Sequence, residues 1–400
     1  MQRIQPEQAS EIVDIVRASA DARRPLAIEG SGSKSGLGRP VEAEQTLSMR
    51  GFSGIRLYQP DELVLTAWSG TSMREIADAL AEKRQHLAFE PSLGAGFYDG
   101  SNEAGTIGGV LACNLSGPRR PSAGAARDHF LGFTAVNGLG EEFKAGGKVV
   151  KNVTGYDLPK LLAGSMGTLA VLLEVTVKVL PAPEKQRTVI VSVPNVATGH
   201  RCLITQLQQA FEIDGAALLP APVAARSSVD LVRGPGSALA ALRLAGSPVS
   251  VADRCAALRA AIGMTSEELH TMRSQALWAE IGEVASLLPG TEGALWRLSV
   301  PPASGERVAA QLGEGEDWLM DWGGGRVWIT RRETSVDDAA VVRKAVAAVG
   351  GHATLMRGPE SLRRAIDVFP MEAPPALLQR TKAAFDPHGI LNPGRMYRDW

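Results

Sequence analysis

The sequence predicts an α+β fold with more than one domain. Short apolar, β-branched runs such as residues 63–68 and 169–177 have the character of buried strands, whereas residues 8–20 carry apolar side chains at helical spacing. Glycine-rich turns separate these elements along the first 183 residues. The chain has 400 residues, 44% of them hydrophobic, which suffices for two or three domains of ordinary size.

The composition disfavours several classes of function. The formal net charge is −1, from 42 basic and 43 acidic residues, without a block of like charges, which disfavours nucleic acid or an anionic membrane as the main partner. No apolar run approaches about 18 residues and the first residues lack a signal-peptide pattern, so we expect a cytoplasmic protein. The three cysteines lie far apart, which predicts buried thiols rather than a disulfide framework or an iron–sulfur or zinc site.

A glycine-rich loop follows the first predicted strand of this region, residues 25–29. Its residues are Gly30, Ser31, Gly32, Ser33, Lys34, Ser35, Gly36, Leu37 and Gly38. Because glycines let backbone amides converge without interference from a Cβ atom, this composition is typical of a phosphate cradle. The loop matches neither the dinucleotide fingerprint nor the Walker pattern, since Ser35 stands where the third glycine of the fingerprint belongs. Taken alone, it is equally compatible with a flexible surface turn.

The first of two glycine clusters follows a strand at 63–68 and a helix at 76–85, whose start is marked by the capping-box spacing of Ser72 and Glu75. The cluster is Gly105-Thr106-Ile107-Gly108-Gly109, and it opens a short apolar helix, residues 110–113. Free amides and the positive end of that helix predict that an anion lies there.

The second glycine cluster, Gly164-Ser165-Met166-Gly167-Thr168, precedes the buried strand 169–177. Glycines there allow a flat ligand to lie against the backbone. Between the clusters, two prolines predict a loop over 114–121, and Asn137-Gly138 predicts a hairpin.

The middle of the chain, residues 187–357, is predicted to form two βαβ-type units, hence a sheet covered by helices. The predicted strands are 188–193, 215–219, 294–300, 326–330 and 352–357, and the predicted helices are 197–211 and 337–349. Residues 220–248 are rich in Ala, Gly, Pro and Ser, and we expect them to form mobile loops.

Five motifs are more specific together than apart. They are Gly30 to Gly36 after a strand, Thr106-Ile107-Gly108-Gly109 with Asn114 and Gly117, Lys151 to Leu158, Gly164-Ser165-x-Gly167-Thr168, and the ending Phe385 to Arg395. In this combination the sequence resembles the FAD-linked oxidases of the vanillyl-alcohol-oxidase type, and within them the E subunits of bacterial glycolate oxidases. The resemblance is strong over the first 183 residues and the last 20 or so, and weak in the middle.

The resemblance implies three segments: a two-lobed, PCMH-type FAD-binding domain over residues 1–183, a ferredoxin-like α+β cap over 184–371, and a C-terminal segment, 372–400, that returns to the FAD domain. It also implies that the first loop and the Thr106 cluster wrap the pyrophosphate and that the Gly164 cluster lies beside the rest of the cofactor. The residues expected at FAD are Gly30, Ser31, Gly32, Ser33, Lys34, Gly105, Thr106, Gly108, Gly109, Asn114, Gly117, Asn152, Gly155, Gly164, Ser165, Gly167, Thr168, Val171 and Asn392.

Two features of the sequence bear on how FAD is bound. We expect backbone donors rather than a basic cluster to neutralise the phosphates, because the sequence provides no such cluster. Relatives sometimes attach FAD covalently through a histidine of the first loop, and this loop has Lys34 and no histidine, which implies non-covalent FAD.

Catalytic candidates are fewer, because the His-Gly-Asp-Gly-Asn type motif of catalytic 2-hydroxy-acid dehydrogenases in this family is missing. None of the six histidines forms a pair at metal-ligand spacing, so we expect no metal site. His352 is the nearest candidate for a base, and a structural role is its alternative. Arg297, Arg331 and Arg357 are the candidates to bind a substrate carboxylate. Four tryptophans either line a pocket or pack in the core: Trp296, Trp318, Trp322 and Trp328.

The resemblance implies a hetero-oligomer with a homologous FAD-binding D subunit and an iron–sulfur F subunit, with membrane contact only through these partners. The chain would oxidise glycolate or a similar 2-hydroxy acid and pass electrons through flavin to the iron–sulfur subunit. Two alternatives stay open: a non-catalytic FAD-binding assembly subunit, which the missing histidine motif favours, and a stand-alone dehydrogenase of the D-lactate type.

Overall fold

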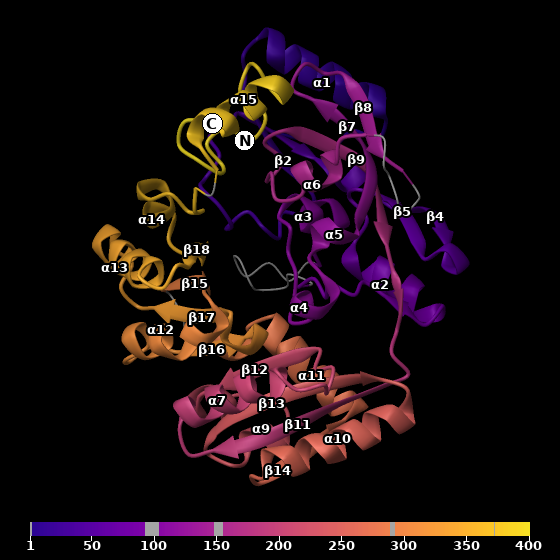
Figure 1. Cartoon of the computed structure of the whole chain (residues 1–400). Coiled ribbons are helices and arrows are strands. Elements are labelled where there is room, and N and C mark those ends of the chain that lie inside the picture. Colours follow the sequence, from indigo (N-terminus) through magenta and orange to yellow (C-terminus); the bar gives the residue numbers. More distant parts are fainter. Residues whose placement is uncertain (1, 93–103, 148–154, 289–292, 372) are drawn as a thin grey trace. The chain divides into compact units, whose positions relative to one another are not determined.

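The computed structural model describes residues 2–92, 104–147, 155–288, 293–371 and 373–400 (Figure 1). The chain forms two compact units. The first unit contains residues 1–116, 124–182 and 367–400, and the second contains 117–123 and 183–366. Both strands and helices occur in each unit, so the predicted α+β class is confirmed.

The first unit contains two main sheets. A parallel sheet has the order β1 (Gln2–Ile4), β3 (Gln45–Ser48), β2 (Leu26–Glu29). An antiparallel sheet has the order β4 (Ile55–Gln59), β5 (Val64–Trp68), β9 (Ala170–Lys178), β7 (Phe130–Asn137), β8 (Glu142–Gly146). The short strands β6 (Gln85–His86) and β10 (Leu180–Pro181) pair with each other. The predicted hairpin at Asn137-Gly138 is confirmed as the β7–β8 pair.

The helices of the first unit follow local sequence signals. They are α1 (Ala9–Asp21), α2 (Met73–Glu82), α3 (Ile107–Ala112), α5 (Ala126–His129), α6 (Leu158–Leu162) and α15 (Pro375–Phe385). The predicted cap of α2 is present, because the Ser72 hydroxyl accepts a hydrogen bond from the Glu75 amide at 3.1 Å. Ile12 and Val16 of α1 are buried in one core cluster with residues of β2, β3, β7 and β9.

The C-terminal segment contributes to the same core. Ile390 and Leu391 belong to the cluster around α1 and are buried. The Leu26 amide of β2 donates to the Ile390 carbonyl at 2.8 Å, and the Asn392 amide donates back to the Leu26 carbonyl at 2.9 Å. The end of the chain therefore lies beside β2, directly before the predicted phosphate loop.

The second unit contains one antiparallel sheet of eight strands, in the order β14-β11-β13-β12-β16-β17-β15-β18. Its first half is β11 (Lys185–Val193), α7 (Val196–Leu207), β12 (Gly215–Leu219), β13 (Ala238–Gly246), α10 (Pro248–Ile262) and β14 (Ser266–His270). Its second half is β15 (Ala294–Ser299), α12 (Gly305–Leu312), β16 (Trp318–Asp321), β17 (Arg326–Arg331), α13 (Val336–Ala347) and β18 (His352–Arg357). Each half has the β-α-β-β-α-β order of a ferredoxin-like unit.

The predicted strands of the second unit are confirmed, and the expectation for residues 220–248 is wrong. These residues contain two short helices, α8 (Ala221–Ala224) and α9 (Asp230–Arg233), and the strand β13. β13 pairs with β11 on one side and β12 on the other, and residues 238–244 are buried. Its alanines, which resemble a loop composition, are small enough to pack on both faces of a central strand.

Three further helices complete the second unit: α4 (Arg120–Ala123), α11 (Thr271–Gly282) and α14 (Glu360–Ala365). α7 and α10 pack against β11 and β13, whereas α13 packs against β18 and α12 against β17. The side chain of Trp278 in α11 donates a hydrogen bond to the Thr188 hydroxyl of β11 at 2.9 Å.

Candidate functional site

The predicted phosphate loop follows β2 and contains three successive amides that no backbone or side-chain acceptor satisfies in the part of the chain that the structure describes. They are the backbone amides of Ser31, Gly32 and Ser33. Gly32 has a φ of 81°, which turns the loop back on itself. The hydroxyls of Ser31 and Ser33 lie 3.2 Å apart, and the Lys34 ammonium lies 3.2 Å from the Ser33 hydroxyl. Successive amides beside a cation form a site that fits an anion.

Three cations gather at this loop, so the expectation that no basic cluster exists is wrong. Arg50 donates to the Ser31 carbonyl at 2.9 Å, and Arg395 donates to the Lys34 carbonyl at 2.6 Å. Lys34 itself is buried. The cluster is invisible in the sequence because its members come from three distant segments. Burial raises the pKa of the nearby Cys113 thiol, and the positive charges of Lys34 and Arg395 act in the opposite direction.

The first three amides of α3, those of Ile107, Gly108 and Gly109, are already hydrogen-bonded, which differs from the prediction of free amides at this helix start. The amides of Ile107 and Gly108 donate to the carbonyls of Thr71 and Ser69 at 3.0 and 2.8 Å. The Gly109 amide donates to the Thr106 hydroxyl at 3.2 Å. The start of α3 is thus held against the turn between β5 and α2. The loop at 31–33, whose amides have no acceptor among the described residues, accommodates the predicted anion better.

Glycines in the first cluster allow close packing instead. A Cβ atom on Gly108 would lie 2.7 Å from the Ser69 Cβ atom, and one on Gly30 would lie 2.2 Å from the Thr106 hydroxyl. The Gly105 carbonyl accepts a hydrogen bond from the Met73 amide at 2.8 Å. Thr106 and its neighbours therefore support the phosphate loop from behind.

The second glycine cluster docks on the end of α3. The amides of Gly164 and Met166 donate to the carbonyls of Leu111 and Ala112 at 3.1 and 2.8 Å. The Thr168 hydroxyl donates to the Ser165 carbonyl at 2.6 Å. These bonds bring the two glycine clusters, far apart in the sequence, into one site.

Asn114 and Asn392 brace this site with their side chains. The Asn114 side-chain oxygen accepts from the Arg127 amide at 3.1 Å. The Asn392 side chain accepts from the Ile28 amide at 2.7 Å and donates to the Met166 carbonyl at 2.8 Å. A Cβ atom on Gly167 would lie 2.8 Å from the Asn392 side-chain nitrogen. Asn392 thus joins β2, the second glycine cluster and the C-terminal segment.

Sequence reasoning missed a buried lysine beside this brace. The Lys382 ammonium donates to the carbonyls of Thr168 and Leu391 at 2.7 and 3.1 Å and pairs with the Asp386 carboxylate at 2.6 Å. Asp386 also accepts from the Ile390 and Leu391 amides at 3.1 and 2.8 Å. Burial lowers the pKa of Lys382, against the opposing effect of Asp386. Its spacing of four residues from Asp386 was the available signal.

The remaining predicted cofactor residues differ in their placement. Val171 is fully buried in the core cluster of the first unit, so its side chain is not available to a ligand. Gly155 is exposed, and Asn152 lies outside the described residues. Gly117 belongs to the second unit, where its carbonyl accepts from the Trp322 indole at 3.1 Å.

Three of the four catalytic candidates, Arg297, His352 and Arg357, lie on neighbouring strands of the second unit. Arg297 of β15 is opposite Thr354 of β18, and Ser299 is opposite His352. Because alternate residues share a face of a strand, Arg297 and His352 lie on the same face of the sheet. Arg297 donates to the Thr354 hydroxyl at 3.5 Å. Arg357, at the end of β18, is opposite Leu295 across a bulge.

Arg331 is not a candidate for substrate binding. Its guanidinium pairs with the buried carboxylate of Asp338 in α13 and donates to the Leu312 carbonyl at 2.8 Å. The hydrogen bond with Asp338 raises the pKa of Arg331. Among the four predicted tryptophans, Trp296, Trp318 and Trp328 are buried, as core packing requires, and Trp322 is half-buried.

Within the described ranges, every helix falls short of the length and apolar character that crossing a bilayer requires. A further search of those ranges finds no group of three His, Cys, Asp or Glu side chains arranged to hold a metal ion.

Comparisons with known proteins agree with this architecture. A family model described as an FAD binding domain matches residues 2–146, and one described as the C-terminal domain of FAD linked oxidases matches residues 367–396. The chain is 34% identical over 395 residues to the glycolate oxidase subunit GlcE of Escherichia coli, with 97% of each chain covered. It is 29% identical to a D-lactate dehydrogenase of Archaeoglobus fulgidus over 50% of this chain and 43% of the relative.

Solved structures show the same fold at low sequence identity. A p-cresol methylhydroxylase with substrate bound superposes with a TM-score of 0.74 at 15% identity, covering 99% of this chain and 88% of that one. A 4-ethylphenol oxidase from Gulosibacter chungangensis superposes with a TM-score of 0.73 at 14% identity, covering 99% and 89%.

The fold and these matches define a flavin-dependent oxidoreductase. The chain belongs to the family of FAD-linked oxidases, and FAD is its cofactor. The successive amides of Ser31 to Ser33 fit the diphosphate of this cofactor, because the positive charges of Lys34, Arg50 and Arg395 converge on the same loop. The resemblance stated from the motifs is confirmed.

Proposed function

We propose that the protein is an FAD-binding subunit of a glycolate oxidase complex that oxidises glycolate or a related 2-hydroxy acid to the 2-oxo acid. The observation that carries this proposal is the 34% identity to a glycolate oxidase subunit over 97% of both chains, which includes the second unit as well as the first. The matches to relatives named as D-lactate dehydrogenases cover about half of this chain.

The first unit holds the cofactor in this proposal. The amides of Ser31 to Ser33 and the cations of Lys34, Arg50 and Arg395 bind the diphosphate, supported by the Thr106 cluster. The turn at 164–168 lies beside the rest of FAD and is positioned by Asn392 and Lys382. The first loop has no histidine, which supports non-covalent binding.

The second unit binds the substrate in this proposal. FAD, when bound, supplies two-electron oxidation. The Arg297 guanidinium binds the carboxylate of the 2-hydroxy acid, with Arg357 at the neighbouring strand end as its aid. His352, on the same face as Arg297, accepts the proton of the substrate hydroxyl. A carboxylate bound between the two strands is thereby oriented with its hydroxyl toward an imidazole.

We further propose that electrons pass to a partner iron–sulfur subunit and that a homologous FAD-binding subunit completes the complex, as the family resemblance implies. The sequence itself supports this arrangement, since its three cysteines are not spaced as iron–sulfur ligands. Contact with a membrane would be made through these partners.

A second candidate function is a non-catalytic assembly subunit that retains FAD. The observation in its favour is the missing His-Gly-Asp-Gly-Asn type motif in the sequence. The two candidates differ in what Arg297 does, because an assembly subunit has no need of a group that binds the substrate carboxylate.

The experiment that tests the proposal reconstitutes the complex with its partners and measures glycolate-dependent reduction of a dye acceptor. We expect activity to disappear when this chain is omitted and to fall at least about tenfold with Arg297→Ala, while assembly and flavin content stay unchanged. Full activity of the partners without this chain would contradict the proposed function. Loss on omission without any effect of Arg297→Ala would favour the assembly subunit.

A further inference from the structure

Residues 117–123 belong to the second unit although the elements before and after them belong to the first. Ser116 and Gly124, on either side, are part of the first unit, as are β7, β8 and β9, which follow. We call residues 117–123 the strap. The strap contains α4 and begins three residues after Asn114, a predicted cofactor residue.

The second unit has a seam where its two ferredoxin-like halves meet. The seam is the pairing of β12 with β16, which rests on the register pair Leu218 and Met320. By contrast, β11 and β13 share nine register pairs and β15 and β17 share six. The two halves are therefore joined by far fewer backbone hydrogen bonds than hold each half together.

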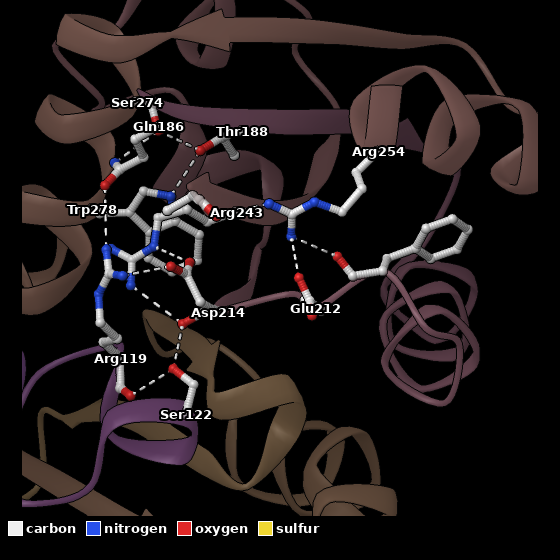
Figure 2. Close-up of polar contacts among 12 residues, drawn as sticks. Arg119, Ser122, Gln186, Thr188, Glu212, Asp214, Arg243, Arg254, Ser274 and Trp278 are labelled. Atoms are coloured by element: carbon white, nitrogen blue, oxygen red, sulfur yellow. Dashed lines mark hydrogen bonds and ion pairs between the residues drawn. The ribbon is translucent and has the colours of Figure 1, made fainter. Parts of the chain in front are cut away.

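The strap contacts the first half directly before β12. The Arg119 guanidinium pairs with the Asp214 carboxylate at 2.6 Å, and the same carboxylate accepts from Arg243 at 2.7 Å (Figure 2). Arg119 also donates to the Gln186 side chain at 3.4 Å, and the Ser122 hydroxyl donates to the Asp214 carbonyl at 3.4 Å. Arg119 is only 9% exposed, so this ion pair is poorly screened by water.

The cluster of Arg119, Asp214 and Arg243 is held by a polar network inside the first half. The Arg243 guanidinium lies 4.6 Å from the centre of the Trp278 ring. Gln186 donates in turn to the Ser274 hydroxyl at 2.9 Å (Figure 2). Because each of these groups is held by another, the position of Asp214 is well defined, and so is that of the Arg119 side chain that reaches it.

The strap contacts the second half directly after β16. The Trp322 indole donates to the Gly117 carbonyl at 3.1 Å, and the Arg120 guanidinium lies 5.0 Å from the centre of the Trp322 ring. The Arg326 guanidinium lies 4.1 Å from the same centre. Trp322 adopts a φ of 54°, a conformation that is uncommon for a bulky residue and costs free energy. The strained turn is what presents the indole to the strap.

We propose that the strap staples the seam of the cap sheet, with Arg119 and Trp322 as its positioning residues. Arg119 and Ser122 of the strap hold the start of β12, and Gly117 and Arg120 hold the end of β16. The half that carries Arg297 and His352 is thereby held in register with the half that carries Asp214. The staple adds side-chain bonds where backbone pairing is sparse.

Hydrogen exchange on the full-length, FAD-loaded protein tests the staple without reference to the substrate. In Arg119→Met, we expect amides of β12 and β16 to exchange at least about tenfold faster, while those of β7 and β9 keep their rates. Arg187→Met is the matched control, because Arg187 is a half-buried arginine of β11 that pairs with Glu268 of the edge strand β14 at 2.9 Å. Unchanged exchange at β12 and β16 in Arg119→Met, or an equal effect in Arg187→Met, would overturn the inference.

Two further variants separate a staple from general destabilisation. Trp322→Phe removes the donor to Gly117 but keeps a ring beside Arg120, and it should loosen the same two strands. Combined with Arg119→Met it should add nothing, because either change releases the strap. Additive effects would mean that the two contacts act separately and would overturn the stapling. Arg119→Lys, which keeps a charge beside Asp214, should partly restore slow exchange even where Arg119→Met folds poorly.

A kinetic test of the same inference, with glycolate as substrate, rests on the proposed function. In the complex, Arg119→Met should raise the KM for glycolate about tenfold at unchanged flavin content, because Arg297 loses its fixed position, and Arg119→Lys should recover part of that loss. An unchanged KM together with loosened strands would overturn the positioning role of Arg119. A wild-type protein without glycolate turnover would contradict the proposed function alone, and the exchange measurements would still decide on the staple.

Discussion

The side chain of Asn392 donates a hydrogen bond to the Met166 carbonyl at 2.8 Å, across 226 residues of sequence. The same side chain accepts a hydrogen bond from the amide of Ile28 in β2. Only Glu29 separates Ile28 from Gly30, the first residue of the phosphate loop. Both partners are backbone groups, so Asn392 ties the C-terminal segment to β2 and to the second glycine cluster through main-chain atoms.

Replacing Asn392 by Ala should therefore damage the cofactor site. The variant leaves the Ile28 amide and the Met166 carbonyl without this partner in a buried place, and we expect a loss of about 2–4 kcal/mol in the free energy of unfolding and weaker FAD binding. Urea unfolding and flavin titration measure the two effects. Asn195→Ala is the control: it removes the cap of α7 in the second unit, at about 1 kcal/mol, and should leave FAD affinity unchanged.

The free energy of unfolding should depend on pH through the protonation of Lys382. Burial lowers the pKa of its ammonium, so the unfolded chain binds more protons than the folded protein between that lowered pKa and the ordinary value of about 10.4. The free energy of unfolding should accordingly gain a positive slope with pH in this window, and Lys382→Met should lack it. Denaturation at several pH values up to 10.5 or so checks the difference; equal slopes in the two proteins would refute it.

The cations at the phosphate loop should make FAD binding sensitive to salt. We expect Arg395→Met to raise the Kd of FAD about tenfold, since one charge and the bond to the Lys34 carbonyl are lost together. The affinity of the variant should also fall less steeply with added salt than that of the wild type. Arg74→Met, on the exposed side of α2, serves as the control and should bind FAD as the wild type does.

Two arginines of the cap sheet should respond oppositely to replacement. Arg297→Ala should raise the KM for glycolate at least about tenfold, because the guanidinium that binds the substrate carboxylate is lost. Arg331→Met should leave the KM unchanged but cost about 3 kcal/mol of stability, because Asp338 loses its partner. Steady-state kinetics and thermal unfolding of both variants separate the roles, and a KM effect of Arg331→Met would contradict this assignment.

The fold was predictable from the sequence wherever local signals decide it. Ser72 caps α2, Asn137-Gly138 turns the β7–β8 hairpin, and the β-branched run of β9 is buried. β13 was missed because its alanines are compatible with either a loop or a tightly flanked strand, and only the neighbours β11 and β12 decide between them.

The candidate site was predictable only in part, for a different reason. The glycine clusters are contiguous in sequence, so they stand out. Of the cations at the loop, Arg50 reaches it from the segment after β3 and Arg395 from the C-terminal segment, and no local pattern reports either approach. Likewise, the amides at the start of α3 looked free, because their acceptors on Ser69 and Thr71 are carbonyls, which carry no sequence signature.

The most direct test of the central claim is a visible absorption spectrum of the purified chain alone, recorded without oxygen before and after adding glycolate. The proposed function predicts flavin bands that bleach on addition of glycolate, and predicts that Arg297→Ala shows the same bands without rapid bleaching. Bands that persist in the wild-type chain would contradict oxidation by this subunit and favour the assembly role.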